Sequence, residues 1–167
     1  AVWVAPAAPA WAAALGLCGG ALLVLPLPWR VRLAGLPWLL PLMWPVVDRP
    51  PPGRFELVVA DVGQGSAVLV RTAGHLLVHD AGPRLGDRGD AGERVLLPLL
   101  HARGERRIDR LVLSHRDSDH VGGAPALLAG LPVGELLASL EPGHALWRSR
   151  GPGGERVPGR RDRKSVV

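Results

Sequence analysis

Cysteine, tyrosine and phenylalanine are scarce in this chain of 167 residues. Its one cysteine, Cys18, excludes an intrachain disulfide framework and any zinc site that depends on cysteine ligands. Tyrosine is absent and phenylalanine occurs once, so aromatic platforms for stacking nucleic-acid bases are few. Charged residues are missing from the first 29 positions and abundant after Asp48. The chain therefore joins an apolar front to a charged rear.

Lysine is almost absent as well, because all but one of the 20 basic residues are arginine. The net charge of +5 permits attraction to polyanions. The arginine bias partly reflects genome composition and is a weak sign of nucleic-acid binding. The 22 glycines and 17 prolines follow no collagen-like period, which excludes a fibre, and an apolar content of 47% excludes a disordered polar chain.

Two apolar stretches precede the charged region. Residues 1–28 are long enough to cross a hydrocarbon layer of ~30 Å at ~1.5 Å per residue. Residues 33–47 are short for a span and contain a proline at every fourth position, so we expect a short or kinked membrane helix, with a re-entrant or interfacial segment as the alternative. Arg30 and Arg32 favour a cytoplasmic connector, which puts the later residues on the outer face if the second stretch crosses.

Composition predicts four regions: membrane segments over 1–48, a proline-rich linker over 49–54, a soluble domain over 55–140, and a disordered or non-native tail over 141–167. The chain lacks an initiating methionine and a basic leader, so we expect it to begin inside a longer protein. Its last six residues match the peptide that a common sequencing adapter encodes. Within the soluble domain we expect strands over 55–60, 67–71, 76–78, 111–113 and 133–137, and helices over 90–103 and 121–131. This alternation predicts an α/β fold.

The strongest motif is His115-Arg116-Asp117-Ser118-Asp119-His120, which follows an apolar strand and precedes a helix. Four potential metal ligands fall within these six positions. In an extended segment, positions 115, 117 and 119 project to one side, and His120 turns inward as the helix begins. Imidazole and carboxylate groups together suit Zn²⁺, Mn²⁺ or Fe²⁺. The motif therefore predicts a divalent-metal site.

The motif continues into Gly122 and Gly123, which allow the backbone to pass close to the site. In this form it resembles the ligand loop of the metallo-β-lactamase fold. Asp61-Val62-Gly63-Gln64-Gly65 and Asp80-Ala81-Gly82 narrow the resemblance to the ComEC family, the DNA-internalisation channel proteins of bacterial competence. The resemblance implies part of an αββα sandwich, preceded by one or two transmembrane helices.

The resemblance also implies a site for two divalent ions, zinc or manganese. His115 and Asp117 would bind the first ion, and Asp119 and His120 the second. Asp119 would in addition orient or deprotonate the attacking water. The fold needs a second half with another histidine and a bridging ligand, which we expect outside this chain, so the truncated chain is expected to be inactive by itself.

Neighbouring loops support these ligands in the family. By resemblance, Asp80 anchors the ligand loop from behind. Asp61, together with Gly63, Gln64 and Gly65, would shape the turn that borders the site. Ser66 stands where the family often has an acid, at a position that varies.

The implied reaction is hydrolysis of phosphodiester bonds in DNA, single- or double-stranded, by a domain on the periplasmic or extracellular side of a bacterial inner membrane. DNA, membrane lipid and other competence proteins are the expected partners. Two alternatives stay open: a non-catalytic domain that gates or docks at the channel, and a membrane-tethered phosphoesterase with substrates other than DNA.

Overall fold

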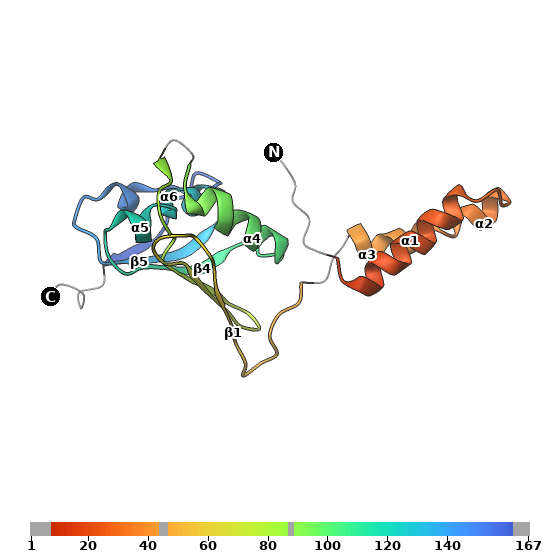
Figure 1. Cartoon of the computed structure of the whole chain (residues 1–167), viewed down its shortest axis with the longest axis horizontal. Coiled ribbons are helices and arrows are strands. Elements are labelled where there is room, and N and C mark those ends of the chain that lie inside the picture. Colours follow the sequence, from red (N-terminus) through yellow and green to blue (C-terminus); the bar gives the residue numbers. More distant parts are fainter. Residues whose placement is uncertain (1–7, 44–46, 87–88, 162–167) are drawn as a thin grey trace. The chain divides into compact units, whose positions relative to one another are not determined.

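The computed structural model describes residues 8–43, 47–86 and 89–161, which divide into two units (Figure 1). The first is helical and comprises the residues up to Asp48 together with residues 102–104. The second begins at Arg49 and contains all the strands.

The first unit contains α1 (Ala10–Val24), α2 (Trp29–Leu33) and α3 (Leu36–Met43). Glycine allows close packing here, because a Cβ added at Gly19 would lie 2.7 Å from the carbonyl oxygen of Gly35. Many large apolar side chains point outward, including Leu17 and Val24. Within the described residues, no helix combines the length and the apolar character needed to cross a bilayer. The membrane spans expected from the sequence stay predictions.

The second unit contains a six-stranded sheet in sequential order. Its strands are β1 (Glu56–Val59), β2 (Val68–Arg71), β3 (Leu76–His79), β4 (Ile108–Leu113), β5 (Val133–Ala138) and β6 (Gly159–Arg161). The first three strands are antiparallel, and β3 to β6 are parallel. The turn between β2 and β3 closes where the N–H of Thr72 donates to the carbonyl of His75. The five strands expected from the sequence are present, and β6 is additional.

Helices follow the parallel strands: the π-helical η2 (Gly92–Leu96), α4 (Leu97–Ala102), α5 (Ser118–Val121), α6 (Ala124–Gly130) and the 3₁₀ helix η3 (Ala145–Arg148). Asp90 lies just before the first of them, and its side chain accepts a hydrogen bond from the N–H of Glu93 in the first turn at 2.9 Å. The single helix expected over 121–131 is instead α5 and α6. The break falls at Gly122 and Gly123, where the backbone packs against neighbouring loops.

The helices α4 and α6 lie on one face of the sheet (Figure 1). Between these helices and the sheet is an aliphatic core that includes Leu69, Leu76, Val78, Leu96, Leu100, Leu111, Leu113, Leu127, Leu128 and Leu136. On the opposite face, Leu57 and Val59 are 55% and 69% exposed. Leu57 pairs with Val70, which pairs with Leu77, so this apolar face extends across the first three strands. One helical layer on a mixed sheet is consistent with half of the expected sandwich.

The region from residue 141 to 161 differs from the disordered or non-native tail expected from composition. Its strand β6 pairs with β5, and Leu146 and Val157 are buried in the core. The sequence showed no apolar stripe here because the segment contributes isolated side chains from turns instead of one face of a long element. Residues 162–167 lie outside the described residues.

Candidate metal centre

The candidate site lies at the carboxyl ends of β3 and β4. These strands are parallel neighbours, with His79 opposite Val112, so the loops that follow them emerge side by side. The N–H of Asp80 continues the pairing by donating to the carbonyl of Val112 at 2.8 Å. Ligands of open α/β sheets bind at this edge. The topology therefore brings the Asp80 loop to the histidine-aspartate motif.

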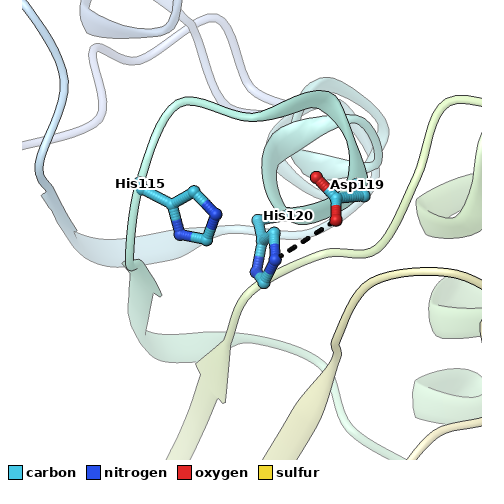
Figure 2. Close-up of side chains that lie close together, drawn as sticks. All are labelled: His115, Asp119 and His120. Carbon is cyan, nitrogen blue, oxygen red and sulfur yellow. Dashed lines mark ion pairs between the residues drawn. The ribbon is translucent and has the colours of Figure 1, made fainter.

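His115, Asp119 and His120 come together at this edge (Figure 2). One ligand atom from each lies within 4.8 Å of the others. The two imidazole rings have centroids 3.8 Å apart, and Nε2 of His120 lies 3.4 Å from Oδ2 of Asp119. His115 comes from the loop after β4, whereas Asp119 and His120 come from α5. A short helix thus turns two adjacent residues toward a histidine in the loop.

Asp117 lies at the margin of this group. Its Oδ2 is 3.5 Å from Nε2 of His115, and its side chain is 67% exposed. It is the backbone N-cap of α5, and its carbonyl accepts a hydrogen bond from the N–H of His120 at 3.0 Å. Asp117 is therefore close to one expected partner, His115, but is not part of the three-residue cluster.

Asp80 lies beneath the cluster with only 1% of its surface exposed. Its Oδ1 accepts a hydrogen bond from the backbone N–H of Ser114 at 2.8 Å. Its Oδ2 contacts Nδ1 of His120 at 2.8 Å and the hydroxyl of Ser66 at 2.8 Å. Burial alone raises the pKa of this carboxyl, but these hydrogen bonds, and one from the Ser114 hydroxyl, outweigh burial and hold the pKa below its ordinary value. Asp80 is therefore an ionised acceptor.

An ionised Asp80 fixes the tautomers of both histidines. Because the carboxylate can only accept, Nδ1 of His120 donates to it, which leaves Nε2 as the free nitrogen of the neutral ring. The hydroxyl of Ser114 donates to Asp80 and therefore accepts from Nδ1 of His115 at 2.8 Å. Both rings thus keep Nε2 available as a ligand. In metal sites, the ring nitrogen of histidine that does not bind the metal usually donates a hydrogen bond to an acceptor in this way.

Glycines bring the surrounding backbone close to the ligands. A Cβ on Gly65, which has a φ of +90°, would lie 1.9 Å from the carbonyl oxygen of Asp119. A Cβ on Gly122 would lie 2.2 Å from the nitrogen of Arg84, and one on Gly123 would lie 2.2 Å from the carbonyl oxygen of Ala81. Alanine does not fit at these three positions without backbone movement.

The remaining turn residues lie at the rim of the site. Asp61 is exposed and accepts a hydrogen bond from the N–H of Gly63 at 3.1 Å, which closes the turn. Gln64 is exposed between the two turn glycines, and nothing lies within 4 Å of a Cβ built at Gly63. Within the described residues, the close approach of this turn to the cluster is the one at Gly65.

Ser66 and Ser114 were missed as site residues by reasoning from the sequence. Neither serine has the partners of a catalytic triad in its sequence context, and a hydroxyl that links a buried carboxylate to a histidine has no spacing signature. The sequence signal for a site role would have been adjacency, because Ser66 directly follows the Asp61–Gly65 turn and Ser114 directly precedes His115. In the structure, Ser66 also lies 3.2 Å from Nδ1 of His120, so both serines help to organise the imidazoles.

The donor set fits a divalent transition metal. It offers two imidazole nitrogens and at least one carboxylate, which suits zinc, manganese or iron better than the all-oxygen sites of calcium or magnesium. The buried carboxylate behind the histidines adds support that a chance surface cluster lacks.

Comparison with known proteins gives a consistent result. The model of the metallo-beta-lactamase superfamily matches residues 60–166. Competence protein ComA of Neisseria gonorrhoeae is 38% identical over 82% of this chain and 20% of its own length. Recombination protein 2 of Haemophilus influenzae is 39% identical over 50% of this chain and 10% of its own. ComE operon protein 3 of Bacillus subtilis is 35% identical over 49% and 12%. The chain thus spans a fifth or less of these relatives.

Proposed function

Because this chain belongs to the metallo-beta-lactamase superfamily and is similar to competence proteins of the ComEC family, we propose that it is part of a bacterial DNA-uptake protein with a metal-dependent phosphodiesterase domain. The superfamily implies metal binding, and the cluster of His115, Asp119 and His120 supports it. DNA as substrate rests on the names of the relatives. The proposed partners are DNA, membrane lipid and other competence proteins.

The observation that carries the proposal is the arrangement of Asp80 behind the two histidines. One buried carboxylate reaches His120 directly and His115 through the Ser114 hydroxyl, so both Nε2 atoms are free at the carboxyl edge of the sheet. A merely structural histidine pair needs no such shared anchor. The arrangement favours two histidines that are held ready for a metal.

His115, Asp119 and His120 would hold the ion, and Asp117 lies near enough to His115 to join them after a side-chain rotation. When bound, the ion supplies Lewis-acid stabilisation of a phosphodiester and lowers the pKa of water. Asp119 is half-exposed beside His120, where its carboxylate can orient a water molecule and accept its proton. Asp80 keeps the rings in the required tautomer throughout.

We place the domain on the outer side of the inner membrane, behind membrane segments within residues 1–48 and a linker over 49–54. A second ion needs more ligands than the described cluster offers, so we expect further ligands from residues outside this chain. On this proposal the 167-residue chain binds metal without efficient hydrolysis.

The test uses a protein of the relatives' length that contains this chain, assayed for metal content and for cleavage of DNA. We expect bound zinc or manganese and metal-dependent cleavage that Asp119→Asn abolishes. Absence of bound metal in the folded protein would overturn the proposal. Undiminished DNA uptake by the Asp119→Asn protein in cells would favour the gating or docking alternative. Cleavage confined to other phosphodiesters would favour the membrane-tethered phosphoesterase.

A further inference from the structure

The segment between β5 and β6 forms a short hairpin that carries arginines. Arg150 and Arg156 face each other as an isolated antiparallel bridge. The turn between them is closed by a hydrogen bond from the N–H of Gly151 to the carbonyl of Glu155 at 2.8 Å. Directly paired residues of an antiparallel bridge project their side chains to the same side. The backbone therefore brings two guanidinium groups together.

These two arginines and Arg148 line a hollow of about 240 Å³. All three are exposed, and among the described residues none of them forms an ion pair with a carboxylate. Residues 142–161 contain five arginines and one acid, Glu155, whose carboxylate lies over Gly151. The hollow is thus a cluster of cations without internal neutralisation, which favours an anionic ligand.

A second hollow of about 500 Å³ adjoins the first and shares Arg156 with it. Its other walls are mainly apolar and include Trp147, Pro142 and Pro158. The indole of Trp147 lies against Gly159, where a Cβ would come within 2.7 Å of the ring. Its Nε1–H donates to the carbonyl of Glu141 at 3.0 Å, so the ring is fixed in orientation.

We propose that the two hollows bind a stretch of single-stranded nucleic acid, with phosphates at Arg148, Arg150 and Arg156 and a base against Trp147. A single strand of nucleic acid carries anionic phosphates next to flat apolar bases. The two adjoining hollows likewise place guanidinium groups next to an aromatic wall. A sulfated polysaccharide would use the arginines and leave the apolar hollow empty. A phospholipid offers one phosphate, and a peptide offers carboxylates only where its sequence is acidic, so neither repeats anion and flat ring as a nucleic acid does.

The two hollows are linked to the metal-ligand loop by the hydrogen bonds of one residue, Glu141. Glu141 accepts a hydrogen bond from Arg116 at 2.5 Å through its carboxylate and from Trp147 through its carbonyl. Arg116 directly follows the ligand His115. A nucleic-acid strand held in the hollows would therefore lie beside the ligand loop. The inference rests on the proposed hydrolase function and adds to it a site that holds the substrate.

The experiment measures binding of a fluorescein-labelled oligothymidylate of about twelve nucleotides to the 167-residue chain in detergent, with EDTA present so that metal plays no part. We expect Arg148→Ala and Arg156→Ala each to weaken binding roughly threefold to tenfold and to reduce the salt slope by about 0.7. Arg156→Lys keeps the charge and should restore most of the binding. The matched control is Arg106→Ala, which removes an equally exposed arginine that lines neither hollow.

An abasic oligonucleotide of the same length tests the aromatic hollow without altering the protein. It should bind roughly fivefold or more weakly than oligothymidylate, because base stacking is lost. Equal binding of the two oligonucleotides, or arginine variants that bind as tightly as the parent, would overturn the inference. Since the assay contains no metal, failure of metal binding would sink the hydrolase proposal and leave this result unchanged.

Discussion

Nδ1 of His120 lies 2.8 Å from Oδ2 of Asp80, a carboxylate that is almost completely buried. The backbone supports this pair, because the N–H of Ala81 donates to the carbonyl of His120 at 2.7 Å. Asp80 itself has a φ of +58°, a left-handed conformation that aspartate tolerates better than most residues. The side-chain contact and the backbone contact therefore fix the loop after β3 against α5.

Asp80→Asn should weaken zinc binding to this chain about 10- to 100-fold, the usual effect of losing a carboxylate behind a metal-bound histidine. The amide replaces one acceptor by a donor and no longer selects the required tautomer of His120. Isothermal titration with zinc measures the change. Glu93→Gln is the matched control, because it makes the same acid-to-amide change at an exposed residue. Equal affinities for Asp80→Asn and the parent chain would show that Asp80 has only a structural role.

Gly65→Ala should impair metal binding in a way that Gly63→Ala does not. Both glycines have positive φ, so backbone strain alone should cost about 1–2 kcal/mol of stability for alanine at either position, and the steric clash at Gly65 adds to this. Only the Cβ at Gly65 meets the backbone of Asp119, whereas nothing lies within 4 Å of one at Gly63. Denaturant unfolding combined with zinc titration separates the two effects. A similar loss of zinc affinity in both variants would contradict the contact with Asp119.

Glu105 is the centre of a buried ion network, and Glu105→Ala should destabilise the α/β unit by about 3–5 kcal/mol. Its side chain has no exposed surface and pairs with Arg71 at 2.9 Å and with Arg49. Burial alone lowers the pKa of Arg71, but its hydrogen bonds to Glu105 and Glu56 outweigh this and hold the pKa above its ordinary value. Removal of Glu105 therefore takes its buried partner from a buried cation and leaves it the half-exposed Glu56.

The control for Glu105 is Glu135→Ala, which breaks a more exposed pair with Arg110 at 3.2 Å and should cost about 0–1 kcal/mol. Urea unfolding of both variants gives the comparison. A loss of less than about 1 kcal/mol for Glu105→Ala would mean that the network contributes no more than a surface pair.

Local pattern predicted the strands and the ligand loop, since alternating apolar residues and a dense histidine-aspartate motif are signals within one segment. Contacts between distant segments left no such signal. Glu105 in Gly-Glu-Arg-Arg reads as a solvated charge, yet Arg71 and Arg49 reach it from 34 and 56 positions away. Likewise, Ser66 gave no sign of a site role, because its partner Asp80 lies 14 residues further on. Trp147 and Val157 appeared to belong to a tail because β6 was too short to recognise.

The two aspartates of the ligand motif provide the last prediction. The sequence resemblance pairs Asp117 with His115, whereas the structure groups Asp119 with both histidines and leaves Asp117 67% exposed. In this chain, Asp119→Asn should therefore reduce zinc affinity more than Asp117→Asn. Zinc at 100 times its dissociation constant should stabilise the parent chain by about 2.7 kcal/mol, and excess EDTA should remove this gain. Thermal unfolding with and without zinc measures both variants. A larger loss for Asp117→Asn would mean that the loop rearranges on binding and that Asp117 is a primary ligand.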